Sequence, residues 1–105
     1  MNDRQNWLKE SVMGAIADDY EDFDMVCAEV SKWARERSLV VEREEIASAL
    51  QQVIDEGYAD AFMYSPELRR YEVTRFSTRR LSGLWFYLSA SGKRFLDRPR
   101  VSRPQ

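Results

Sequence analysis

The stretch "REEIASALQQVIDEGYADAF", residues 43–62, decides the fold, because a helical pattern changes into a strand pattern within it. Its apolar residues recur at helical spacing on one face: Ile46, Ala49, Leu50, Val53 and Ile54. Gly57 stands where a glycine commonly ends a helix. Residues 58–64 then alternate between two sides and are rich in aromatic residues, which predicts a strand. No Ser, Thr, Asp or Asn cap stands just before Arg43, so the first residue of the helix stays open.

Two further helices are expected before this stretch. Residues 7–17 carry an apolar face made by Leu8, Val12, Ala15 and Ile16. Asp22 suits the N-cap of a second helix that ends near Arg37. The apolar face of this second helix consists of Phe23, Val26, Cys27, Val30 and Ala34.

A second strand is expected in "LWFYLS", residues 84–89. Alternation places Trp85 and Tyr87 on one face, opposite Leu84, Phe86 and Leu88, which can pack on the third helix. The connection "PELRRYEVTRFSTRRLS", residues 66–82, is longer than ordinary hairpin loops, so it is either mobile or pairs with itself around "RYEVTRF". Residues 91–97 predict a short helical turn, with Gly92 at the corner that leads into it, and residues 98–105 predict a disordered tail.

Three helices, a hairpin and a closing helical turn resemble a winged helix-turn-helix domain. The resemblance rests on "REEIASALQQVIDEGYADAF" and on "WFYLSASGKRFL", which is similar to the close of the wing in regulators of the MarR and PadR groups. It implies a mainly helical α+β domain over residues 1–97, with a three-helix core, a two-stranded antiparallel wing and a short C-terminal helix. It also implies a DNA-binding transcriptional regulator or accessory factor, although some winged helices bind only protein or RNA.

The composition favours a single small folded domain without catalytic or metal chemistry. The chain has 105 residues, of which 44% are hydrophobic and 32% charged. It contains no histidine and one cysteine, Cys27, which argues against a structural zinc site and against the common catalytic triads. We therefore expect no enzyme activity, no cofactor and no metal. No apolar run is long enough to cross a membrane and the first residues lack the apolar core of a signal peptide, so a cytoplasmic location is expected.

Two short motifs that invite a ligand do not match their consensus. Gly92 and Lys93 suggest a phosphate loop, but Tyr87 stands where that loop needs its first glycine and Arg94 where it needs Ser or Thr. The acidic residues 18–24 are interrupted by Tyr20 and lack the glycine of a calcium-binding loop. Cys27 lies on an apolar helix face, where it is expected to act as a small core residue.

Charge divides the chain into two unlike parts. Residues 1–65 hold 6 Lys and Arg against 15 Asp and Glu, whereas residues 66–105 hold 10 against 3. Basic side chains gather in and after the long connection, with Tyr71 and Phe76 between them, and are candidates for phosphate contacts in double-stranded DNA. They are Arg69, Arg70, Arg75, Arg79, Arg80 and Lys93. A solvated basic loop is the competing interpretation.

The third helix gives conflicting indications about base reading. Its outward residues are expected to include Ala47 and Ser48 and three side chains suited to base edges, Arg43, Gln51 and Gln52. Five carboxylates on and beside the same helix oppose DNA: Glu42, Glu44, Glu45, Asp55 and Glu56. The alternative hypothesis is therefore a winged-helix protein-interaction module, in which the basic surface binds an acidic protein partner or a second copy of the chain.

Overall fold

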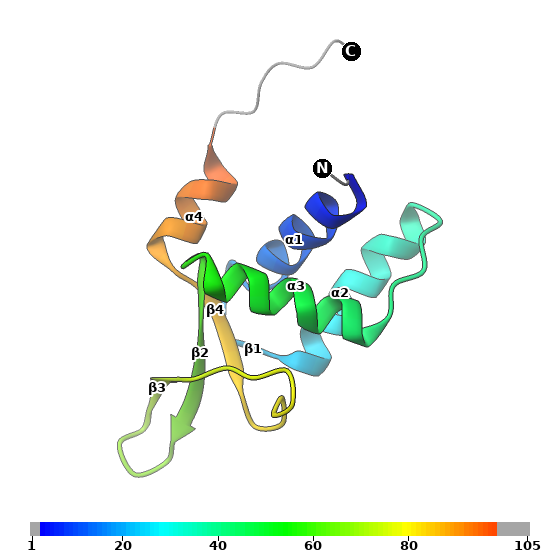
Figure 1. Ribbon diagram of the computed structural model, residues 1–105. Coiled ribbons are helices and arrows are strands. Elements are labelled where there is room, and N and C mark those ends of the chain that lie inside the picture. Colours follow the sequence, from blue (N-terminus) through cyan, green and yellow to red (C-terminus); the bar gives the residue numbers. More distant parts are fainter. Residues whose placement is uncertain (1–2, 99–105) are drawn as a thin grey trace.

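The computed structural model describes residues 3–98, which form four helices and a four-stranded antiparallel sheet (Figure 1). The helices are α1 (Asp3–Ala15), α2 (Phe23–Glu36), α3 (Arg43–Asp55) and α4 (Ala90–Asp97). The strands are β1 (Glu21–Asp22), β2 (Ala59–Ser65), β3 (Arg70–Thr74) and β4 (Trp85–Leu88). The predicted α+β class is confirmed. Most of the predicted tail, residues 99–105, lies outside the described residues.

Local hydrogen bonds define where the central helices begin and end. Asp22 caps α2 as predicted, since its Oδ1 accepts from the N–H of Met25 at 2.9 Å. The start of α3 uses a different device, in which the carboxylate of Glu45 accepts from the N–H of Glu42 at 3.0 Å. Gly57, with φ of 82°, ends α3 as predicted.

The sheet order β1-β4-β2-β3 corrects the predicted two-stranded wing. β2 pairs with the expected partner β4, and on its other edge with β3. β3 is the short pairing within "RYEVTRF" that the sequence left open. The additional strand β1 consists of Glu21 and Asp22, which pair with Phe86 and Trp85 of β4. A strand of two residues has no period, so no sequence pattern predicts it.

The two faces of the sheet have different surroundings. Ala59 and Ala61 of β2 lie beside Leu88 and Phe86 of β4, and all four side chains are buried against the helices. Because side chains alternate along a strand, the intervening residues point to the opposite face. These residues are Asp60, Phe62, Trp85 and Tyr87. The expected division of β4 into a core side and an open side is therefore confirmed.

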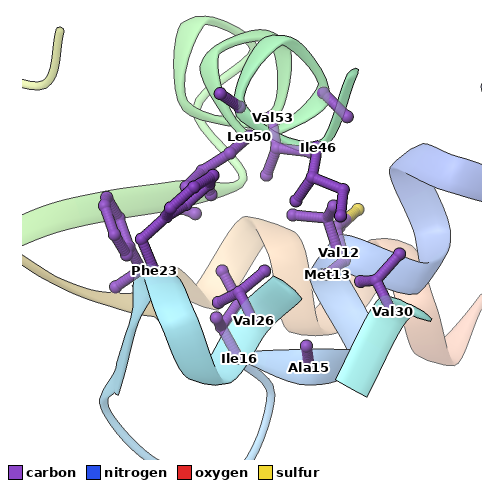
Figure 2. Packing of buried hydrophobic residues seen from close by; sticks show 14 of the residues in the cluster. Val12, Met13, Ala15, Ile16, Phe23, Val26, Val30, Ile46, Leu50 and Val53 are labelled. Carbon is purple, nitrogen blue, oxygen red and sulfur yellow. The ribbon is translucent and has the colours of Figure 1, made fainter. Parts of the chain in front are cut away.

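The core lies between the three long helices and the sheet (Figure 2). Figure 2 shows α1, α2 and α3 directing apolar side chains toward one another, among them Val12, Val26 and Leu50, which are completely buried. The end of α1 is also joined to the sheet, because the carbonyl of Ile16 accepts from the N–H of Leu88 at 3.1 Å. Cys27 is buried in this core, as expected.

Gly92 has a different role from the predicted one. The chain turns at Ser89, whose Oγ accepts from the N–H of Gly92 at 3.0 Å, and Gly92 lies inside α4. A Cβ at this position would lie 2.0 Å from the carbonyl oxygen of Tyr58. The same oxygen accepts from the N–H of Ser89 at 2.9 Å. Gly92 is therefore required for the close approach of α4 to the backbone that leads into β2.

The Gly92→Ala variant is expected to be less stable by about 1–3 kcal/mol, because the added methyl group displaces backbone and not a flexible side chain. Gly14→Ala is the matched control, since its Cβ would meet only the Trp33 ring at 3.8 Å. That control should be neutral or more stable by up to about 1 kcal/mol, owing to the helix propensity of alanine. Urea unfolding of the two variants measures the difference, and equal stabilities would contradict this account of Gly92.

Candidate nucleic-acid interface

Two segments that project at the same end of the molecule carry the basic side chains (Figure 1). We call Arg69, Arg70, Arg75, Arg79 and Arg80 the arginine group; all five are exposed. Arg69 lies in the β2–β3 turn with φ of 55°, and Arg70 begins β3. The other three lie in the β3–β4 loop, residues 75–84.

Apolar anchors hold the β3–β4 loop against the body of the protein. The ring of Phe76 meets that of Phe86 edge to face, with centroids 5.3 Å apart, and Leu81 also packs against the core. Between these anchors the chain turns sharply, since the N–H of Arg80 donates to the carbonyl of Ser77 at 2.9 Å. This turn places Arg79 and Arg80 at the surface between two buried contacts. The loop is longer than an ordinary hairpin connection, and Phe76 and Leu81 attach it to the core.

Within residues 3–98, four of the five members of the arginine group have no ion pair, as is also the case for the exposed Lys32 and Arg35 of α2, whereas other cations of the helices are paired. Lys9, Arg43 and Arg98 pair with the carboxylates of Glu56, Asp24 and Glu10. Within residues 3–98, by contrast, no carboxylate lies in ion-pair distance of Arg69, Arg75, Arg79 or Arg80. Arg70 has a long, exposed contact of 3.5 Å with Glu72, which contributes little in water. The positive charge of this end of the molecule is therefore available to an anion.

The predicted base-reading side chains of α3 are engaged with carboxylates of the protein. The guanidinium of Arg43 donates to Oδ1 of Asp24 at 3.0 Å, and this hydrogen bond raises the pKa of Arg43. Gln51 donates to Asp55 at 2.8 Å, and Gln52 donates to Glu56 at 3.4 Å. Each glutamine lies four residues before its partner, a spacing that could have predicted these bonds from the sequence.

Two residues differ from their expected positions: Ala47 was expected on the outward face of α3, and Lys93 was expected among the basic side chains of the wing. Ala47 is instead buried: it belongs to the core cluster, and it lines a cleft together with Thr78 and Leu81 of the β3–β4 loop. Lys93 donates to the hydroxyl of Tyr87 at 2.9 Å, next to the start of β2, whereas the arginine group begins beyond the other end of β2. The structure therefore does not bring Lys93 together with the arginine group.

A cleft of about 350 Å³ separates the β3–β4 loop from the first half of α3. Its lining combines the apolar residues Phe23, Ala47 and Leu81 with the polar residues Arg43, Glu44, Ser48 and Thr78. No sequence signal predicts it, because the loop reaches α3 only through its fold. The cleft places the first turn of α3 beside the loop that carries Arg79 and Arg80.

Comparison with known proteins adds no relative: no family model, no curated protein and no solved structure matches the chain.

Among residues 3–98, no helix is both long and apolar enough to span a membrane. The same part of the chain holds no group of three or more His, Cys, Asp or Glu side chains that could bind a metal ion. Burial raises the pKa of the Cys27 thiol, which disfavours the reactive thiolate.

Two glutamates have pKa values shifted in opposite directions. The N–H of Glu42, together with the guanidinium of Arg4 at 3.0 Å, lowers the pKa of Glu45. Burial and the nearby Asp19 raise the pKa of Glu21, whose Oε1 is buried and has no hydrogen-bond partner among residues 3–98. Ionised Glu45 therefore stabilises the start of α3, whereas ionised Glu21 destabilises β1.

Glu45→Gln is expected to lower the melting temperature at pH 7, and Glu21→Gln to raise it. The contribution of Glu45 is present above the ordinary glutamate pKa of about 4.3 and disappears as the pH falls through the lowered folded value. The penalty from Glu21 is absent below about 4.3 and develops as the pH rises through the raised folded value. Thermal unfolding between pH 3 and pH 8 measures both effects; differences that persist unchanged at pH 3 would contradict these assignments.

Proposed function

We propose that the chain is a winged helix-turn-helix protein that binds double-stranded DNA through the arginine group, as a transcriptional regulator or accessory factor. The order of α1, α2 and α3 followed by an antiparallel hairpin supports this proposal. The observation that carries it is the gathering of five exposed arginines at one end of the molecule, four of which have no carboxylate within ion-pair distance among residues 3–98. Guanidinium groups suit phosphate oxygens, which offer parallel acceptors to the planar fork.

The contacts of α3 favour backbone binding over base reading. Arg43, Gln51 and Gln52 reach base edges only by leaving Asp24, Asp55 and Glu56. Phosphate contacts position a protein on the duplex but carry no sequence information directly. We therefore propose sequence-tolerant binding, in which the arginine group supplies most of the affinity.

A second candidate function is a winged-helix protein-interaction module that binds no DNA. It is favoured by the carboxylates that accompany α3 and by the β3–β4 loop, which lies across the cleft from the first half of α3. In this function the arginine group docks an acidic protein surface, which includes the acidic first part of a second copy. DNA binding places α3 beside a duplex, whereas the protein-interaction function does not.

Affinity for a labelled duplex should fall with salt concentration in proportion to the phosphates that the arginines neutralise. The slope of log affinity against log salt is about −0.9 per phosphate, so Arg79→Ala/Arg80→Ala should make it shallower by close to two such units. The fall in affinity should be the same for unrelated sequences, because the contacts are to phosphate. Fluorescence anisotropy at several salt concentrations measures both quantities.

The matched control for this titration is Lys32→Ala/Arg35→Ala, which removes two exposed charges from α2. Its total charge equals that of the arginine variant, so a purely global charge effect would change both slopes equally. Equal slopes, or no binding by the unmodified chain at low salt, would refute binding through the arginine group.

Neutralising the carboxylates of α3 tests the position of this helix. Glu44→Gln/Asp55→Asn should increase duplex affinity several-fold at low salt if α3 lies beside the phosphates, because two like charges are removed from the interface. Glu29→Gln/Glu36→Gln on the exposed side of α2 is the control. If both variants bind alike, α3 lies away from the duplex and the protein-interaction function gains support.

A further inference from the structure

The face of the sheet that points away from the helices carries a second cluster of aromatic side chains. We call it the aromatic face; it comprises Tyr20, Phe62, Tyr64, Tyr71, Trp85 and Tyr87. None of these rings belongs to the core cluster or packs against it within the described chain. The rings of Tyr20 and Tyr71 stack with centroids 3.9 Å apart, and Tyr71 meets Trp85 at 5.8 Å.

The aromatic face is partly exposed and offers donors to a ligand. Tyr64 is 45% exposed, and the five other rings of the cluster are half-buried. Tyr87 already accepts from Lys93. Within residues 3–98, the hydroxyls of Tyr20, Tyr64 and Tyr71 and the indole N–H of Trp85 have no hydrogen-bond partner. Such side chains combine an apolar body with a polar tip, which is why they are frequent at interfaces.

The charge around the aromatic face favours a cationic ligand. Asp60 lies on this face directly across from Tyr87, and the exposed Asp18 and Asp19 precede Tyr20. The neighbouring cations are Lys93 and Arg75, which continues the alternation of Tyr71 and Val73 just after β3, so the carboxylates of Asp60, Asp18 and Asp19 outnumber the cations by one. Arg70 pairs with Ser65 in the strand register, so its side chain points to the opposite side of the sheet from Tyr71. A phosphate backbone is therefore disfavoured on the aromatic face.

The size of the aromatic face suits a short segment better than a second globular surface. The four strands have 2, 7, 5 and 4 residues, and at about 3.3 Å along the strand and 4.8 Å across it for each residue they give an area on the order of 300 Å². A stable protein–protein interface buries about 800 Å² on each partner. The length of β2 corresponds to an extended peptide of about seven residues.

We propose that the aromatic face binds an extended, proline-rich peptide segment that carries arginine, from a partner protein. A polyproline helix has no internal hydrogen bonds, so its carbonyls are free to accept from tyrosine hydroxyls and from the Trp85 indole. Proline rings pack between the aromatic side chains, and a guanidinium group meets Asp60, Asp18 or Asp19. This inference goes beyond DNA binding, because the arginine group and the aromatic face have opposite charge preferences.

The test titrates the full chain with the peptide Pro-Pro-Arg-Pro-Pro-Arg-Pro-Pro-Arg and follows the indole N–H signals by nuclear magnetic resonance. The signal of Trp85 should shift in a saturable way, whereas those of Trp7 and Trp33, which pack against the core, should not. A peptide with glutamate in place of arginine, and one with glycine in place of proline, should each bind at least about tenfold more weakly.

Neighbouring residues of β2 provide a matched pair of variants. Tyr64 and Met63 are 45% and 47% exposed, and they point to opposite faces of the sheet. Tyr64→Ala should weaken peptide binding about tenfold, whereas Met63→Ala should leave it unchanged. Asp60→Asn should weaken it less, and the loss should diminish at high salt. None of the three variants removes a member of the arginine group, so duplex binding by each reports separately on the proposed function.

Several results would overturn the proposal. They are the absence of any Trp85 shift up to millimolar peptide, equal binding of the glutamate peptide, and equal losses in Tyr64→Ala and Met63→Ala. Shifts confined to the backbone amides of β3 would indicate strand addition at the sheet edge, which also contradicts docking on the aromatic face.

Discussion

The carbonyl group of Tyr58 is the point on which the arrangement of the elements depends. It follows the glycine that ends α3, it precedes β2, and it accepts from the N–H of Ser89, the N-cap residue of α4. Because Gly92 has no side chain, α4 approaches this carbonyl closely enough for Ser89 to donate also to the carbonyl of Gly57, at 2.7 Å. The end of α3, the sheet and α4 therefore have one fixed relative position, from which β2 and β4 extend toward the arginines.

Between β2 and β4, residues that pack against the core alternate along the chain with exposed arginines. The residues that stabilise the fold are therefore different from the residues proposed to bind a ligand. Phe76 and Leu81 contribute apolar contacts to the core, while the arginines between and beside them contribute none. Arginines at such positions can change without loss of the fold, whereas the anchors cannot. The same separation holds on the sheet, where alternate residues of β4 serve the core and the aromatic face.

The helices and the strands β2 and β4 were predictable because their signals are local. Apolar spacing located α2 and α3, and Asp22 and Gly57 located their ends. The burial of Ala47 was not predictable, because the loop residues that line the cleft beside it lie more than thirty positions later in the chain. β1 consists of two residues, and the aromatic face arises from four separate segments, so neither has a sequence period. The arginines were evident from composition, but the absence of a carboxylate near four of the five within residues 3–98 depends on the fold.

The stacked pair of Tyr20 and Tyr71 joins the turn after α1 to the outermost strand of the sheet, with ring planes 10° apart. The other contacts of β3 are its ladder to β2 and the contact of Tyr71 with Trp85 of β4, both within the sheet. With Tyr20 over it, β3 is held from the side of α1 as well. A ligand that separates these two rings would therefore remove the contact between the segment after α1 and β3 without touching an arginine.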